Sequence, residues 1–208
     1  GLLRWAGTMP DKLAAAIEAE FSGVGSPEFT TLEEGGDYIT GDSRYGMQSH
    51  TFIPVDPDLD EVGLQQLKTR LCQRLQFLAR ELLDAFSEPD RIFVYRLTFR
   101  RVSDEELLRI VRAIRRLGEG WLLYVTLAEA GKPSGTVEVV RDGLMVGYID
   151  HFVEGPNGER QTVDRESWLT ICRNALTIWH EAIARTKQSG PDGGGKQAMR
   201  NTEQLVLL

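Results

Sequence analysis

The chain has 208 residues, of which 41% are hydrophobic and 26% charged, and its formal net charge is -7. This length suffices for a buried core, and the acidic balance argues against binding to nucleic acid or to an anionic membrane, since both need a basic excess. No apolar run approaches the roughly 20 residues that span a bilayer, so we expect no membrane span.

The two cysteines, Cys72 and Cys172, lie far apart, and the sequence has neither a Cys-x-x-Cys pair nor a Cys/His cluster. Disulfides and structural zinc need such patterns, so we expect a cytoplasmic protein with no metal and no cofactor. The chain begins without an initiator Met and runs directly into an apolar cluster at residues 1–7. We therefore expect it to be a fragment whose natural start lies upstream.

The first 60 residues predict a short helix and two strands. Pro10, Leu13 and Ile17 have helical spacing, and Gly23 ends the pattern. Residues 38–40 and 47–53 predict two short strands around a turn at residues 41–46.

The middle of the chain predicts a long helix and then a βαβ unit. Leucines recur every three or four residues over 64–86, which is typical of an amphipathic helix. Residues 92–95 and 121–125 are continuously apolar and predict two buried strands. Between them Ser103 and Glu106 form a capping box, and Gly118 ends the helix that follows. Two strands joined by a helix within this length should be parallel.

The last third of the chain predicts a hairpin, a helix and a tail. Asp142-Gly143 is a tight-turn signal between strands at residues 136–140 and 144–149. One apolar face over residues 168–182 predicts a helix, and the glycine-rich end predicts a flexible C-terminal tail at residues 187–208. The fold class is α/β, a three-layer mixed sheet with a central parallel βαβ unit, a β-hairpin at residues 136–149 and flanking helices. We expect a single domain over residues 1–186.

His50 is the strongest candidate for catalysis, as a general base, because its unperturbed pKa lies near neutral pH. The alternative is a hydrogen-bonded structural histidine, which the residue type alone favours. Asp150 and His151 end the second hairpin strand and point to opposite faces, so they cannot form a dyad with each other. One of them can still face the site of His50, and we name Asp150 as the second catalytic candidate.

Arg96 and Arg100 follow the first strand of the βαβ unit, at the sheet edge where α/β proteins place their ligands. Their guanidinium groups could hold a carboxylate or a phosphate through forked hydrogen bonds. The alternative is a solvated loop whose arginines pair with acids such as Asp104. Arg44 and Tyr45, in the turn before His50, are further candidates for ligand binding.

Neither cysteine is a candidate nucleophile. Cys72 and Cys172 fall on the apolar faces of helical segments and are expected to be small core residues. The sequence contains no Gly-x-Ser-x-Gly, no phosphate-binding glycine-rich loop and no His-Glu-x-x-His.

Several segments together resemble a bacterial family whose members are labelled papain-like cysteine peptidases. The matching stretches are residues 1–6, 45–52, 91–96, 135–138 and 147–150, and the likeness covers most of residues 1–185. The resemblance implies a cysteine nucleophile near a Ser-Leu-Gly segment that precedes the position of Gly1, which this chain does not contain. It also implies that His50 is the base that activates the thiol. By that mechanism the fragment is expected to be inactive.

Two hypotheses follow. The first is a bacterial α/β domain of a Cys/His-type hydrolase or transferase, with His50 as base and the nucleophile segment missing. The alternative is a non-catalytic or glycan-processing accessory module, whose arginines bind an anionic sugar or a phosphorylated ligand. The partner in either case is a small molecule, a peptide or a glycan.

Overall fold

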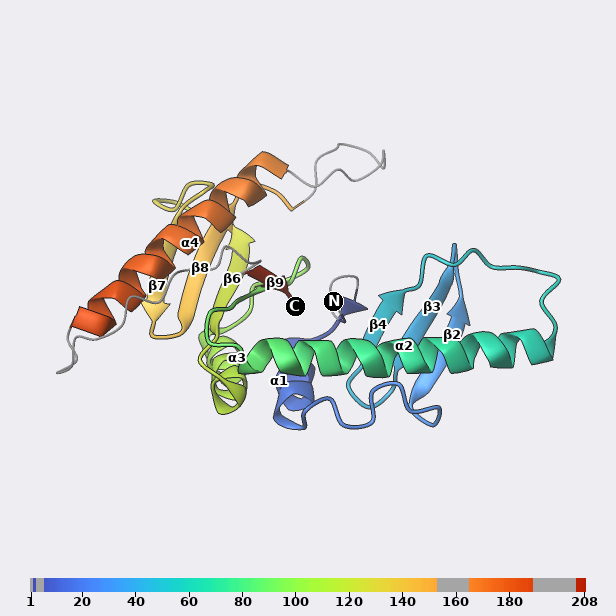
Figure 1. Ribbon diagram of the computed structural model, residues 1–208. Coiled ribbons are helices and arrows are strands. Elements are labelled where there is room, and N and C mark those ends of the chain that lie inside the picture. The colour runs from blue at the N-terminus through green and yellow to red at the C-terminus, as the bar shows by residue number, and fades with distance from the viewer. Residues whose placement is uncertain (1, 3–5, 153–164, 189–204) are drawn as a thin grey trace. The chain divides into compact units, whose positions relative to one another are not determined.

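The computed structural model describes residue 2 and residues 6–152, 165–188 and 205–208 (Figure 1). Contacts gather the chain into two compact units. Unit 1 comprises residues 1–91, 102–120 and 207–208, and unit 2 comprises residues 92–101 and 121–206. The prediction of one domain over residues 1–186 stays a prediction, because units defined by contacts can belong to one cooperatively folding domain.

Unit 1 contains a four-stranded antiparallel sheet in the order β1-β4-β3-β2. The strands are β1 (Ala6–Gly7), β2 (Thr30–Glu34), β3 (Tyr38–Asp42) and β4 (Met47–His50). β3 and β4 are the two predicted strands, paired with Ile39 opposite His50. β2 was not predicted, because its sequence is mostly polar. Only Thr30 of its residues is buried, so the apolar alternation typical of a strand is weak.

The long helix α2 (Glu61–Ser87) runs along this sheet, as predicted from the leucine spacing (Figure 1). Asp60 caps it, since its Oδ1 accepts a hydrogen bond from the Gly63 backbone N–H at 2.8 Å. Leu67 and Leu71 pack with Tyr38 of β3 in one apolar cluster. The helix therefore covers one face of the sheet with its apolar stripe.

Helices α1 (Pro10–Glu18) and α3 (Asp104–Leu117) pack against each other in the same unit. Leu13 and Ile17 of α1 are completely buried. Arg109 of α3 also pairs with Glu18 of α1, with Nη2 and Oε2 2.8 Å apart. The predicted capping box of Ser103 and Glu106 is confirmed.

Gly118 ends α3 as expected, but for a different reason. Its φ of -178° is extended, so it does not form a left-handed cap. A Cβ atom at this position would instead lie 2.1 Å from the carbonyl oxygen of Phe86, at the end of α2. The close approach of two backbone segments therefore requires glycine here.

Unit 2 contains a five-stranded mixed sheet in the order β7-β8-β6-β5-β9. The strands are β5 (Ile92–Arg96), β6 (Trp121–Leu127), β7 (Val137–Arg141), β8 (Leu144–Ile149) and β9 (Leu205–Leu207). β5 and β6 are parallel and β7 and β8 form a hairpin, so the α/β class, the parallel pair and the hairpin are confirmed. β8 also runs parallel to β6.

Helix α4 (Arg165–Gln188) covers the hairpin side of this sheet (Figure 1). Its residues Ile171, Ala175 and Trp179 are buried in one core cluster with the strands. Gly147 of β8 lies directly beneath the helix, because a Cβ there would be 2.8 Å from Cγ2 of Ile171. No helix of the described residues is both long enough and apolar enough to cross a membrane.

The two ends of the predicted flexible tail are a helix end and a strand, whereas residues 189–204 of that prediction lie outside the described residues. Helix α4 continues to Gln188, and β9 adds a strand at the β5 edge of the sheet. The run Leu205-Val206-Leu207 is apolar and β-prone, but three residues are too short to predict a strand.

Replacement of Gly118 by Ala tests the close approach to Phe86. We expect G118A to lower the free energy of unfolding by about 2–3 kcal/mol, since the new methyl group must displace backbone. Gly36→Ala is the matched control, because a Cβ there meets nothing within 4 Å and φ is not in the left-handed region. Urea unfolding followed by tryptophan fluorescence gives both values. Equal stability of the two variants would contradict this explanation.

Candidate functional site

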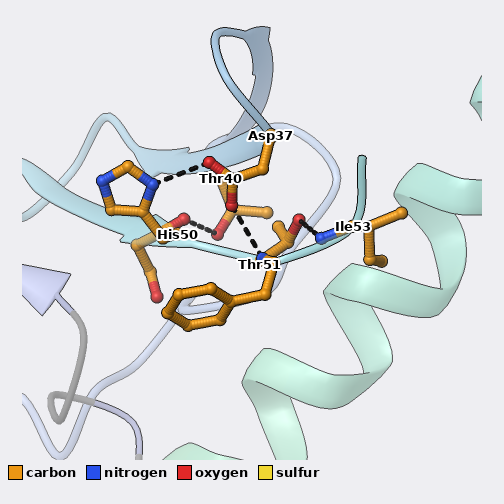
Figure 2. A network of polar contacts seen from close by, with 7 residues as sticks. Asp37, Thr40, His50, Thr51 and Ile53 are labelled. Carbon is orange, nitrogen blue, oxygen red and sulfur yellow. Dashed lines mark hydrogen bonds and ion pairs between the residues drawn. The ribbon is translucent and has the colours of Figure 1, made fainter. Parts of the chain in front are cut away.

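His50 and Asp37 form a side-chain pair at the end of the β3–β4 hairpin. The Nδ1 atom of His50 lies 2.8 Å from Oδ1 of Asp37 (Figure 2). The pair follows from the register, because Ile39 is opposite His50 and Asp37, two residues earlier, shares the same face of the sheet. With Asp37 as acceptor, the neutral imidazole carries its proton on Nδ1 and leaves Nε2 with a free lone pair.

The carboxylate of Asp37 is itself held in place. Its second oxygen, Oδ2, accepts a hydrogen bond from the backbone N–H of Phe52 at 2.7 Å. Phe52 has a φ of 58°, a conformation that residues other than glycine rarely adopt, and its side chain is 63% exposed. The unusual backbone at Phe52 thus turns an N–H toward Asp37, and backbone strain at such a position is typical of functional sites.

After β4 ends, hydrogen bonds still hold residues 51–53 in place beside the start of β3. The Thr51 N–H donates to the Tyr38 carbonyl at 3.0 Å, and the Ile53 N–H donates to the Thr51 hydroxyl at 3.1 Å. Thr40 donates its hydroxyl proton to the carbonyl of Ser49 at 3.3 Å (Figure 2). The backbone on both sides of His50 is therefore held by hydrogen bonds.

The pair changes the acidity of Asp37. The hydrogen bond with His50 lowers the pKa of the Asp37 carboxyl below its ordinary value, and the Phe52 N–H acts in the same direction. The carboxylate is therefore ionised at neutral pH. The His50 side chain is 58% exposed, so the second ring nitrogen can be reached from solvent.

A pocket with a volume of about 100 Å³ adjoins His50 in unit 1. Its strand side is formed by Thr40, Ser49, His50, Thr51 and Phe52, and the rest by Leu2 and by Leu71, Arg74, Leu75 and Leu78 of α2. Leucines dominate the helix side, and Arg74 is its one charged group. The pocket thus combines an apolar helix side with a largely polar strand side, and a combination of apolar and polar groups is typical of small-molecule sites.

Arg44 and Tyr45 lie at the other end of the hairpin, in the turn between β3 and β4. Both bind the carbonyl oxygen of Ser22, Arg44 through Nη1 at 3.1 Å and Tyr45 through its hydroxyl at 2.9 Å. The Arg44 guanidinium also stacks on Phe29, 5.5 Å from the ring centre. These contacts fix the turn, and a role in ligand binding stays a prediction for both residues.

Next to them Asp42 is buried, and only one of its carboxylate oxygens has a partner. Oδ1 accepts a hydrogen bond from the Tyr45 N–H at 2.8 Å, whereas Oδ2 has no partner among the described residues. Burial raises the pKa of this carboxyl above its ordinary value. The turn therefore carries a desolvated acid, which the sequence did not single out.

The other predicted site residues belong to unit 2. Arg96 ends β5 and stacks over Phe152, 5.9 Å from the ring centre, and burial lowers the pKa of its guanidinium. Arg100 donates to the Arg101 carbonyl at 3.0 Å. Asp150 follows β8 and is exposed, with its backbone N–H bound to Ser134 at 3.3 Å. The combination of Asp150 with His50, which lies in unit 1, stays a prediction.

Other charges at the same edge of unit 2 neutralise one another. Arg101 pairs with Glu129 at 2.6 Å, and Lys132 pairs with Glu138. The Tyr148 hydroxyl donates to Glu138 at 2.7 Å, and burial together with this bond raises the pKa of Tyr148 to about 12. Arg101 therefore has an acidic partner, Glu129, which is not one of the acids near Asp104. For Arg96 and Arg100 both the anion site and the solvated loop stay predictions.

Sequence reasoning missed two residues of the site, Asp37 and Arg74. Asp37 follows Gly35 and Gly36, and this local sequence predicts only a turn. The signal that could have identified Asp37 is the register of β3 against β4. Arg74 could have been placed by helical spacing, since positions 71, 74, 75 and 78 share one side of α2. Among the residues that the structure describes, no group of three His, Cys, Asp or Glu side chains could hold a metal ion.

No family model, curated protein or solved structure matches the chain.

Substitution of His50 by Gln tests the electrostatics of the pair. We expect the pKa of Asp37 to rise in H50Q, because the hydrogen bond that lowers it most is lost. A lowered pKa stabilises the folded state above the unfolded value of about 3.9, and this stabilisation is lost as the pH falls through the folded value. The stability difference between wild type and H50Q should therefore shrink below about pH 4.

Carbon-13 NMR titration of the Asp37 carboxyl measures this directly. His180→Gln, on α4 in unit 2, is the control and should leave the titration of Asp37 unchanged. An Asp37 titration in H50Q identical to that of the wild type would show that the two side chains do not interact in solution.

Proposed function

We propose that unit 1 carries the general-base site of a Cys/His-type hydrolase or transferase, with His50 as the base and Asp37 as the residue that orients it. The observation that supports this most is the 2.8 Å contact between Asp37 Oδ1 and His50 Nδ1. Asp37 holds the ring in the tautomer whose Nε2 accepts a proton, and its charge stabilises the imidazolium that forms.

The thiol that the resemblance implies is neither cysteine of this chain. Cys72 is buried in α2, and Cys172 belongs to unit 2. Burial also raises the pKa of the Cys172 thiol, which reduces its thiolate fraction. The proposal therefore concerns His50 and Asp37 as the proton-accepting part of the site.

In the proposed step a thiol attacks the carbonyl carbon of an ester or amide bond. Its proton passes to Nε2 of His50, a bond forms between sulfur and carbon, and the alkoxide or amine leaves with the electrons of the broken bond. For an amine the same imidazolium returns the proton to the leaving nitrogen. Asp37 remains ionised throughout, since its pKa is low.

A thiol added from solution tests the base independently of any cysteine of the protein. With p-nitrophenyl acetate and 2-mercaptoethanol, we expect the wild type to accelerate the thiol-dependent release of p-nitrophenolate. General-base catalysis is worth roughly 100-fold or more, so H50Q should lose about two orders of magnitude of that acceleration. Asp37→Asn should lose about tenfold, because the ring is no longer held in one tautomer. A thiol-dependent rate in H50Q equal to that of wild type would overturn the proposal, and His180→Gln is the matched control.

A second candidate function is anion binding in unit 2, as in an accessory module for an anionic sugar or a phosphorylated ligand. Arg96 supports it, because no carboxylate of the described residues pairs with Arg96, while Arg101 and Lys132 both have acidic partners. Partial burial strengthens the attraction of its charge for an anion. Arg100, four residues later, would supply the second guanidinium.

Titration calorimetry with glucose 1-phosphate tests this candidate. We expect Arg96→Gln and Arg100→Gln each to weaken binding about tenfold, the loss of one charge-assisted contact. Arg141→Gln, at the exposed turn between β7 and β8, removes the same charge elsewhere in unit 2 and should bind like the wild type. If all three variants bound the ligand as tightly as the wild type, the ligand would bind at another surface.

A further inference from the structure

The helix side of the pocket beside His50 combines three leucines with one arginine. Leu71, Leu75 and Leu78 line it from α2, and Arg74 lies between them on the same side of the helix. Leu71 is buried, whereas Leu75 and Leu78 are half-buried and present apolar surface to the pocket. The pocket can therefore take an apolar group and a negative charge at the same time.

Among the residues that the structure describes, none is an acidic partner that would occupy the guanidinium of Arg74. No hydrogen bond or ion pair joins it to any residue that the structure describes. Its neighbours three and four positions away on α2 are Arg70, Leu71, Phe77 and Leu78, so the helix itself supplies no acid. In a chain of net charge -7, an exposed arginine without an acid beside it at the edge of a pocket is available to a ligand.

We infer that this pocket binds a carboxylate ligand with a short branched aliphatic group, with Arg74 holding the carboxylate and the leucines holding the aliphatic part. A single guanidinium matches the two oxygens of a carboxylate. The ionised Asp37, bonded to His50, disfavours a dianion such as phosphate more than a monoanion. An apolar cavity of roughly 150 Å³ holds a benzene ring, so about 100 Å³ suits a smaller group, on the order of four carbon atoms.

This inference rests on the proposed function, because it takes the pocket beside the general base as the substrate site. The inference extends the proposed function by naming the class of substrate. This substrate is an acyl compound or peptide that presents a carboxylate and a small branched side chain. Arg74 is then a specificity-determining residue, and His50 faces the part of the ligand that reacts.

The test is a nitrogen-15 NMR titration with 4-methylpentanoate and with its uncharged analogue, 4-methylpentanamide. We expect the carboxylate to shift the backbone resonances of Ser49 to Phe52 and of Leu71 to Leu78, and to bind at least tenfold more tightly than the amide. In Arg74→Gln this preference should disappear, because both compounds then bind through the aliphatic group alone.

Arg70→Gln is the matched control, since it removes the same charge one turn earlier on α2 at a residue outside the pocket. It should retain the preference for the carboxylate. A preference that persists in Arg74→Gln, or the absence of any shift at the pocket residues with wild type, would overturn the inference.

H50Q separates this inference from the proposed function. Carboxylate binding retained in H50Q, together with a loss of thiol-dependent catalysis, supports both. Carboxylate binding by a wild type that shows no His50-dependent catalysis would overturn the general-base function and leave the ligand class standing.

Discussion

The burial of one apolar stripe along α2 is the constraint on which unit 1 depends. Leu67 and Leu71 pack with Tyr38 of β3. Near the C-terminal end of α2, the backbone of Phe86 lies close to Gly118, the residue that follows α3. Each large side chain buried in this way contributes roughly 1.5–3 kcal/mol, so the stripe adds substantially to the stability of unit 1, beside the packing of α1 on α3. Residues on the flank of the stripe remain half-buried, and there α2 leaves the pocket open toward β4.

The contact of Asp37 with His50 has its main effect on orientation and not on stability. His50 is largely exposed, and water could satisfy its ring nitrogens, so an ion pair at this position contributes little to folding. The Phe52 N–H nevertheless holds the Asp37 carboxylate from the other side, through a backbone conformation that is costly for a phenylalanine. The same contact would also hold a hydrogen-bonded structural histidine, so general-base catalysis by His50 stays a proposal.

The sequence predicted those features that depend on local spacing. The long helix, the capping box at Ser103, the parallel pair β5–β6 and the hairpin β7–β8 each follow from periodicity or turn chemistry within a short segment. β2 was missed because it is mostly polar, and β9 because it has only three residues. Both strands are defined by pairing with a neighbouring strand and not by an apolar pattern of their own. The same holds for the site. The sequence named His50 as a candidate, but Asp37 reaches it only through the register of β3 against β4.

On the two proposals taken together, the charges around the pocket would couple ligand binding to proton transfer. When His50 takes up a proton, a positive charge forms at the edge of a pocket that already contains Arg74. Two like charges oppose each other, here only weakly, because the side chains of His50 and Arg74 are both exposed to water. A bound carboxylate neutralises Arg74 and removes this repulsion, while Asp37 continues to stabilise the imidazolium from the other side. In the proposed site, the anion that Arg74 selects would thus offset the charge that His50 gains during the transfer.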